Sequence, residues 1–187
     1  MANPKPERSV RMSDINTKTL AADAIGIGEG VEILRAGGLL AFPTETVYGL
    51  GADATNDMAV ARIYAAKGRP NFNPLIAHFS DVASAKSHVI WPKEAEILAD
   101  AFWPGAITFV LEKRKDSRLS PLLSAGLSSV AIRVPNHPVA ADLLHRLAGP
   151  IAAPSANPSG AISPTTSEHV LADRKSTRLN SSHSSVS

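Results

Sequence analysis

Four short stretches of the chain place polar and charged side chains beside prolines, glycines and apolar runs. Lys67 and Arg69 stand two residues apart before Pro70, and on an extended backbone both cations would point the same way. A lysine supplies a mobile point charge and an arginine a planar fork, which together suit the phosphates of a nucleotide. Alone, a Lys-x-Arg pair is more often a solvated basic turn, so its setting decides between these interpretations.

Ser155 and Asn157 lie between Pro154 and Pro158, directly after the apolar residues 151–153. Small side chains between stiff prolines form a rigid loop that a nucleotide can approach closely. The serine hydroxyl and the asparagine amide can donate to phosphate or ribose. The same residue types are common in capping turns that bind no ligand, so this motif alone leaves both interpretations open.

Arg133 lies in the apolar run 130–134, where a charge requires a partner. A substrate carboxylate would be a bidentate partner, and a structural Asp or Glu would serve nearly as well. His78 ends another apolar run, where a histidine is more often a satisfied core residue. His137 precedes Pro138 and is interpreted as the cap of a helix.

The segment 39–51 begins as an apolar run and ends in a polar loop. Residues 39–42 predict a strand buried on both faces, and Pro43 should end its central pairing. The loop then carries hydroxyl and carboxyl side chains and two glycines that permit a positive φ, namely Thr44, Glu45, Thr46, Tyr48, Gly49 and Gly51. Such a loop after a buried strand is where α/β proteins place ligands, although an ordinary polar turn has the same composition.

Helical and extended patterns alternate along the chain and predict an α/β domain. The predicted strands cover 39–42, 75–79, 107–112, 129–134 and 151–153. The predicted helices cover 19–36, 59–66, 82–88, 93–101 and 138–147, and a last one begins at 167. Asn56 or Asp57 should cap the second helix.

In this order the motif-bearing blocks resemble the YrdC-type family, the threonylcarbamoyl-AMP synthases of tRNA modification. The blocks are 39–51, 67–78, 103–108, 131–138 and 153–160, and the resemblance runs from about residue 34 to about residue 173. It implies a YrdC-like α/β fold, with a twisted mixed sheet and flanking helices around an open cavity. It also implies a reaction that joins L-threonine, bicarbonate and ATP into threonylcarbamoyl-AMP and pyrophosphate.

The resemblance further implies roles for individual residues. Catalytic roles fall on Lys67 and Arg69. The implied ATP contacts are Arg69, Asn73, Ser129, Ser155, Asn157 and Ser163. The implied L-threonine contacts are Thr46, His78, Arg133 and the backbone at Ala153. ATP would enter as its Mg2+ complex, with no metal site in the protein, and the product would pass to a separate tRNA threonylcarbamoyl transferase.

Composition restricts the cellular setting. The chain is 44% hydrophobic and 19% charged, as is typical of a soluble globular protein. It has no cysteine, which excludes disulfides and thiolate zinc sites. With no signal peptide and no long apolar run, we expect a cytoplasmic protein without membrane contact. RNA contact is compatible with the family, but the net charge of +2 argues little for it.

Three segments are predicted: a disordered arm over 1–18, a YrdC-like domain over 19–173, and a low-complexity tail over 174–187. After Asp173 the family pattern breaks off. Members continue with a strand pair, carrying a Ser-Thr-Val-type segment and an Arg-Pro-Gly turn, which line the site. A foreign tail on an incomplete and therefore inactive domain is one interpretation, and a natural tail on a divergent member is the other. The clean break favours the first. The true start, Met1 or Met12, stays open.

Two other functions fit parts of the pattern. The same fold occurs in hydrogenase-maturation carbamoyltransferases, where it makes an adenylate from carbamoyl phosphate. Those proteins are longer and carry cysteine-rich zinc segments, so the absence of cysteine argues against this function. A double-stranded RNA-binding module without catalysis would use the same basic residues to hold phosphate. Pyrophosphate release separates an enzyme from a binding module.

Overall fold

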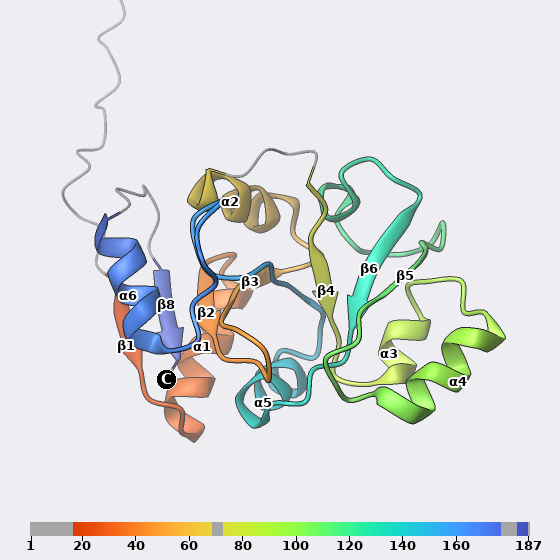
Figure 1. The fold of residues 1–187 in the computed structure, drawn as a ribbon, viewed down its shortest axis with the longest axis horizontal. Helices are drawn as coiled ribbons and strands as arrows, with labels where there is room; N and C mark the ends of the chain where they lie inside the picture. The colour runs from red at the N-terminus through yellow and green to blue at the C-terminus, as the bar shows by residue number, and fades with distance from the viewer. Residues whose placement is uncertain (1–16, 69–72, 177–182, 187) are drawn as a thin grey trace, which may run out of the picture.

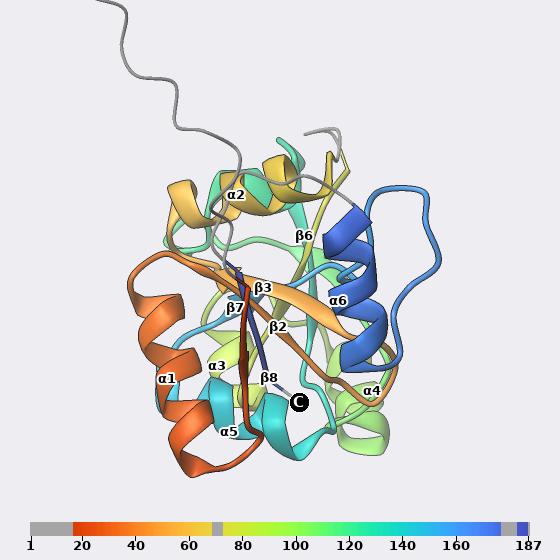
Figure 2. The same cartoon turned by 90° about the vertical axis from the view of Figure 1, so that its left-hand side faces the viewer.

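The computed structural model describes residues 17–68, 73–176 and 183–186. Figures 1 and 2 show one mixed sheet with helices on both faces, its strands in the order β1-β8-β2-β3-β7-β4-β6-β5. The strands are β1 Lys18–Leu20, β2 Leu39–Phe42, β3 Gly49–Asp53, β4 Ile76–His78, β5 Phe109–Glu112, β6 Ser129–Arg133, β7 Ile151–Ala152 and β8 His183–Val186. The helices are α1 Ala24–Arg35, α2 Asp57–Lys67, α3 Val82–Lys86, α4 Lys93–Phe102, η1 Pro121–Ser124, α5 Pro138–Leu147 and α6 Ser167–Ser176. The predicted α/β fold is confirmed.

Two apolar cores cover the two faces of the sheet, and β2 contributes to both. Leu39 and Ala41 join the core that contains α2, whereas Leu40 and Phe42 join the core beneath α1 and α5. All four side chains have no exposed surface. The alternation follows from the period of two in a strand, and it confirms the prediction of a strand buried on both faces.

The glycines after the polar loop lie in a strand, so the predicted loop over 49–51 is wrong. Gly49 and Gly51 belong to β3, which pairs antiparallel with β2 and β7, and neither has a positive φ. A Cβ on Gly51 would lie 2.7 Å from the ring of Phe42 and 2.9 Å from Ile151. Glycine is required here because neighbouring side chains cross the strand closely.

The predicted helices are present with shifted ends. Asn56 caps α2 and His137 caps α5, and each side chain accepts from backbone N–H groups of the first turn. The helix predicted over 19–36 begins only at Ala24, where Asp23 caps it, because β1 occupies the preceding residues. No helix in the described part of the chain is long and apolar enough to cross a membrane.

The first and last described strands lie side by side near one edge of the sheet. β8 lies between β1 and β2 and is parallel to both, and α6 runs through Ser176. The sequence predicts neither feature, since the segment of β8 is short and serine-rich and has no apolar alternation. Of the predicted arm, residues 1–16 lie outside the described residues, and Lys18 belongs to β1. The foreign origin of residues 174–187 stays a prediction.

Candidate active site

Three of the predicted threonine contacts meet where β4 and β6 end. His78 and Arg133 are register partners on these parallel strands. Thr46, in the loop between β2 and β3, accepts a 3.3 Å hydrogen bond from Arg133 Nη1. Ala153 borders this place, because its N–H donates to the carbonyl of Ile76, two residues before His78.

Arg133 is nearly buried, at 6% exposure, and it meets a carboxylate to which the sequence analysis assigns no role. Its Nε donates to the carbonyl of Gly105 at 3.1 Å, and its Nη2 lies 2.6 Å from Glu45 Oε1. Of the two partners that the sequence leaves open for Arg133, a structural Asp or Glu and a substrate carboxylate, the first is therefore present. The only sequence signal for Glu45 is its place in the polar loop beside Thr46.

Four buried polar atoms in and around this ion pair have no well-aligned hydrogen bond among the described residues. They are both carboxylate oxygens of Glu45, Arg133 Nη2 and His78 Nδ1. Arg133 Nη2 nevertheless lies 2.6 Å from Glu45 Oε1, and the backbone N–H of Asn136 also faces this carboxylate. An unsatisfied buried polar group costs about 1–3 kcal/mol, and such groups are rare in proteins. Their clustering indicates a place for a polar ligand.

The site holds a charged pair and a neutral imidazole. Burial alone would raise the pKa of Glu45, but hydrogen bonds from Arg133 and from the backbone N–H groups of Asn136 and Glu45, together with the Arg133 charge, hold this pKa below its usual value. Burial, and then the charge of Arg133, lower the pKa of His78 to about 4. At neutral pH Glu45 is therefore ionised and His78 is uncharged.

His78 gives a first testable prediction, that stability falls on acidification. Between a folded pKa of about 4 and an ordinary value near 6.5, the unfolded state binds more protons. The free energy of unfolding should therefore drop by about 2 kcal/mol from pH 7 to pH 5 through this residue. Urea denaturation of wild type and of His78→Gln at both pH values measures this contribution as the difference between their pH dependences. An equal pH dependence in the two proteins would contradict it.

Lys67 is the last residue of α2, so the predicted extended backbone is wrong at this position. The helix continues until Gly68, whose φ of +57° ends it. The Lys67 side chain is 4% exposed, and its Nζ donates to the carbonyls of Ser155 and Asn157. Arg69, the second predicted catalytic residue, lies outside the described residues.

The loop 154–164 holds three predicted ATP contacts beside Lys67. Asn157 Nδ2 donates to the carbonyls of Pro158 and Ala161 at 2.8 Å, and Ser163 Oγ donates to Asn157 Oδ1 at 3.3 Å. The Asn157 amide therefore organises a turn. Ser155, half-buried at the start of the loop, bridges to Gly49. The loop is thus tied to both α2 and the end of the polar loop.

Two further predicted ATP contacts are Ser129, which lies apart from the ion pair, and Asn73, which lies beside α2. Ser129 begins β6 and Arg133 ends it, which separates them by about 13 Å along the strand. The backbone carbonyl of Asn73 accepts from the hydroxyl of Tyr64 on α2 at 3.1 Å. The structure thus brings the threonine set together, and it joins Lys67 to Ser155, Asn157 and Ser163.

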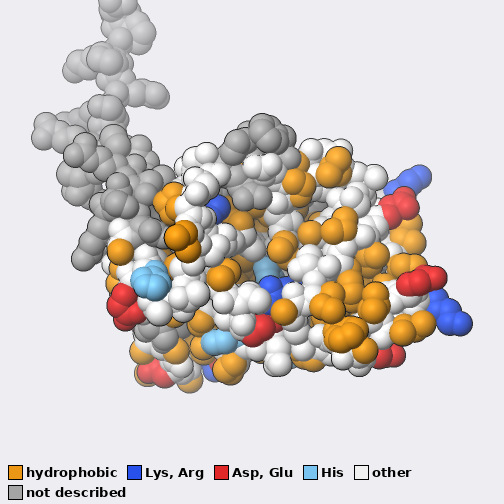
Figure 3. Space-filling model, in the orientation of Figure 1, with side chains coloured by type: hydrophobic (Ala, Val, Ile, Leu, Met, Phe, Trp, Pro, Cys, Tyr) orange, Lys and Arg blue, Asp and Glu red, His pale blue; other side chains and the backbone are white. Residues whose placement is uncertain are grey.

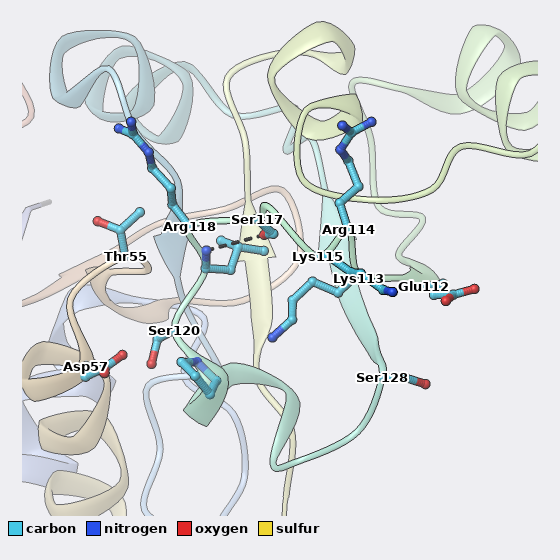
Figure 4. Close-up of a pocket in the computed structure, with 12 residues that line it drawn as sticks. Thr55, Asp57, Glu112, Lys113, Arg114, Lys115, Ser117, Arg118, Ser120 and Ser128 are labelled. Atoms are coloured by element: carbon cyan, nitrogen blue, oxygen red, sulfur yellow. Dashed lines mark hydrogen bonds between the residues drawn. The ribbon is translucent and has the colours of Figure 1, made fainter.

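The surface carries hollows of different character. Figure 3 shows one near the middle of the face, with histidine and basic atoms in its depth and acidic atoms close by. Figure 4 shows another, of about 660 Å3, between the start of α2 and the segment after β5. Arg114 and Arg118 extend away from Asp57 and Ser120 there, and Arg114 pairs with Asp116. The charged side chains that line this hollow point outward and carry both signs, so they do not converge on one ligand.

Comparison with known proteins gives a consistent result. The family model Sua5_yciO_yrdC, described as "Telomere recombination", matches residues 32–178. The threonylcarbamoyl-AMP synthase of Bacillus subtilis is 49% identical over 158 residues, which cover 84% of this chain and 45% of that protein. The threonylcarbamoyl-AMP synthase of Pyrococcus abyssi is 50% identical over 144 residues, with 75% and 41% coverage. The chain thus spans less than half the length of these two curated relatives.

A solved structure extends the similarity to three dimensions. The crystal structure of P. abyssi Sua5 complexed with L-threonine matches with a TM-score of 0.83 and 40% sequence identity. The match covers 91% of this chain and 49% of that one. The sheet and its flanking helices are therefore those of the Sua5 fold, as the sequence blocks predict.

Proposed function

The chain belongs to the Sua5/YciO/YrdC family, and from this membership we propose that it is an L-threonylcarbamoyladenylate synthase. The amine of L-threonine takes up bicarbonate as a carbamate, with loss of water. A carbamate oxygen then attacks the α-phosphorus of ATP, and pyrophosphate leaves. The observation that carries the proposal is the nearly buried Arg133 among polar atoms without a well-aligned hydrogen bond, in a fold whose P. abyssi relative is complexed with L-threonine.

Each residue group has a task in this reaction. Arg133 orients the threonine carboxylate with the donors that Gly105 and Thr46 leave free. His78 stays neutral and adds no charge to a site that gathers anions. Lys67 and the loop 154–164 face the nucleotide, where Arg69 adds charge for the phosphates. Positioning and fixed charge carry the rate enhancement, so no covalent nucleophile is needed.

Magnesium enters this proposal with the nucleotide. Among the residues that the structure describes, no group of three or more His, Cys, Asp or Glu side chains could hold a metal ion. In the proposed reaction Mg2+ arrives bound to the phosphates of ATP, which supply most of its ligands. We further propose a cytoplasmic enzyme whose product passes to a separate tRNA threonylcarbamoyl transferase.

The second prediction is a substrate requirement. Pyrophosphate release from ATP should need L-threonine and bicarbonate together, and omission of either should lower the rate at least about tenfold. Mass spectrometry should identify threonylcarbamoyl-AMP as the product. Serine and valine are the matched controls, since they test the methyl and the hydroxyl of threonine.

The alternatives give different results in the same assay. Release that depends on carbamoyl phosphate would indicate a carbamoyl-adenylate-forming domain. Tight binding of double-stranded RNA, without binding of threonine or ATP, would indicate an RNA-binding module. Binding of both substrates without turnover would indicate a domain that lacks part of its catalytic wall.

A further inference from the structure

Glu45 lies against Arg133, and the roles assigned so far do not use its carboxylate. We propose, on the basis of the proposed function, that Glu45 binds the ammonium group of the amino-acid substrate while Arg133 binds the carboxylate. The pair would then form a clamp for an α-amino acid zwitterion. This gives the site a selectivity that Arg133 alone, which fits any carboxylate, would not provide.

The charges of the pair match those of such a substrate. Glu45 and Arg133 hold opposite charges 2.6 Å apart, and an α-amino acid carries its ammonium and carboxylate on one carbon. When the substrate lies against the pair in the opposite orientation, its ammonium faces Glu45 and its carboxylate faces Arg133. The exposed fractions of the two side chains are only 8% for Arg133 and 20% for Glu45, so solvent screens these contacts weakly.

The hydrogen-bonding capacity left over also fits. Both oxygens of Glu45 are buried, and the donors beside them, Arg133 and the backbone N–H of Asn136, leave acceptor capacity that the three donors of an ammonium could use. Arg133 Nη2 likewise has no well-aligned hydrogen bond among the described residues, while Gly105 and Thr46 hold Nε and Nη1.

Glu45 is a binding residue in this proposal and not a base. Its lowered pKa keeps the carboxylate ionised at neutral pH, so it attracts an ammonium but is a weak acceptor for its proton. Loss of Glu45 should therefore appear first in affinity for ligands that carry an amine.

The experiment compares ligands on the full 187-residue chain by titration calorimetry. The ligands are L-threonine, 3-hydroxybutyrate, which lacks the amine, and 1-amino-2-propanol, which lacks the carboxylate. The Glu45→Gln variant should bind L-threonine about 10- to 100-fold more weakly than wild type does. It should bind 3-hydroxybutyrate at least as tightly as wild type does. Glu112→Gln, an exposed carboxylate variant, is the control and should change neither affinity.

The ratio of two affinities within one variant does not depend on how much of it is folded. Equal or tighter threonine binding by Glu45→Gln would overturn the clamp and leave the proposed function intact. If wild type binds another α-amino acid more tightly than L-threonine and Glu45→Gln weakens that binding, the clamp holds and threonine is the wrong substrate. A wild-type protein that binds L-threonine no better than 3-hydroxybutyrate would also overturn the clamp.

Discussion

Replacing Arg133 by leucine is expected to weaken L-threonine binding at least about 30-fold while leaving ATP affinity within about threefold. The guanidinium is nearly buried and offers the carboxylate donors that neighbouring groups leave free. Truncating one partner of a buried charge pair costs about 2–5 kcal/mol, which sets the size of the effect. Titration calorimetry with each ligand separately measures both affinities.

Two further variants complete this test. Arg146→Leu removes an exposed helix arginine that pairs with Asp142, and it should change neither affinity. Arg133→Lys keeps the charge but loses the planar fork, so its threonine affinity should be intermediate. If Arg133→Leu lowers ATP affinity and leaves threonine affinity unchanged, the role given to Arg133 is wrong.

The sequence predicts most elements whose signals are local. The apolar run of β2 and the proline-initiated α5 with its His137 cap have patterns that sterics and capping explain. β3 is missed because its glycines, which the sequence analysis takes for loop residues, serve a close crossing of Phe42 and Ile151. β1 and β8 are missed because each is a short, mostly polar segment without an apolar alternation.

The candidate site is predictable in its residue types and not in its partners. A charge within an apolar strand requires a counter-charge, and that inference from Arg133 alone is correct. Which carboxylate supplies the counter-charge depends on how the polar loop folds over the end of β6. The distance between Glu45 and Arg133 cannot be predicted from local sequence patterns. The register that places His78 beside Arg133 is likewise a product of the sheet order.

The contacts of Lys67, at the end of a helix, are likewise not predictable from the local sequence. Gly68 can end a helix, but Pro70 suggests an extended stretch starting at Lys67, and the structure gives the final helical turn instead. The amine consequently reaches back to the carbonyls of the loop 154–164. A role in fixing this loop therefore joins the predicted role in phosphate binding, and experiment can separate the two.

Lys67→Met should lower the rate of threonylcarbamoyl-AMP formation at least about tenfold, because at least about 1.4 kcal/mol of charge-assisted bonding is lost. Methionine keeps the apolar stem and removes only the buried amine. The carbonyls of Ser155 and Asn157 then lose a donor, so stability should also fall by about 1–2 kcal/mol. Lys86→Met, at a more exposed lysine paired with Glu96, is the matched control.

Comparing ATP with adenosine separates the two roles of Lys67. A lysine that contacts phosphate contributes to ATP affinity and not to adenosine affinity. Lys67→Met should therefore weaken ATP binding more than adenosine binding, and this difference should shrink at high salt. A lysine that only shapes the loop would affect both ligands alike, since the loop would approach ribose and phosphate together. Equal losses for the two ligands would therefore assign Lys67 to the loop, and unchanged synthesis in Lys67→Met would exclude both roles.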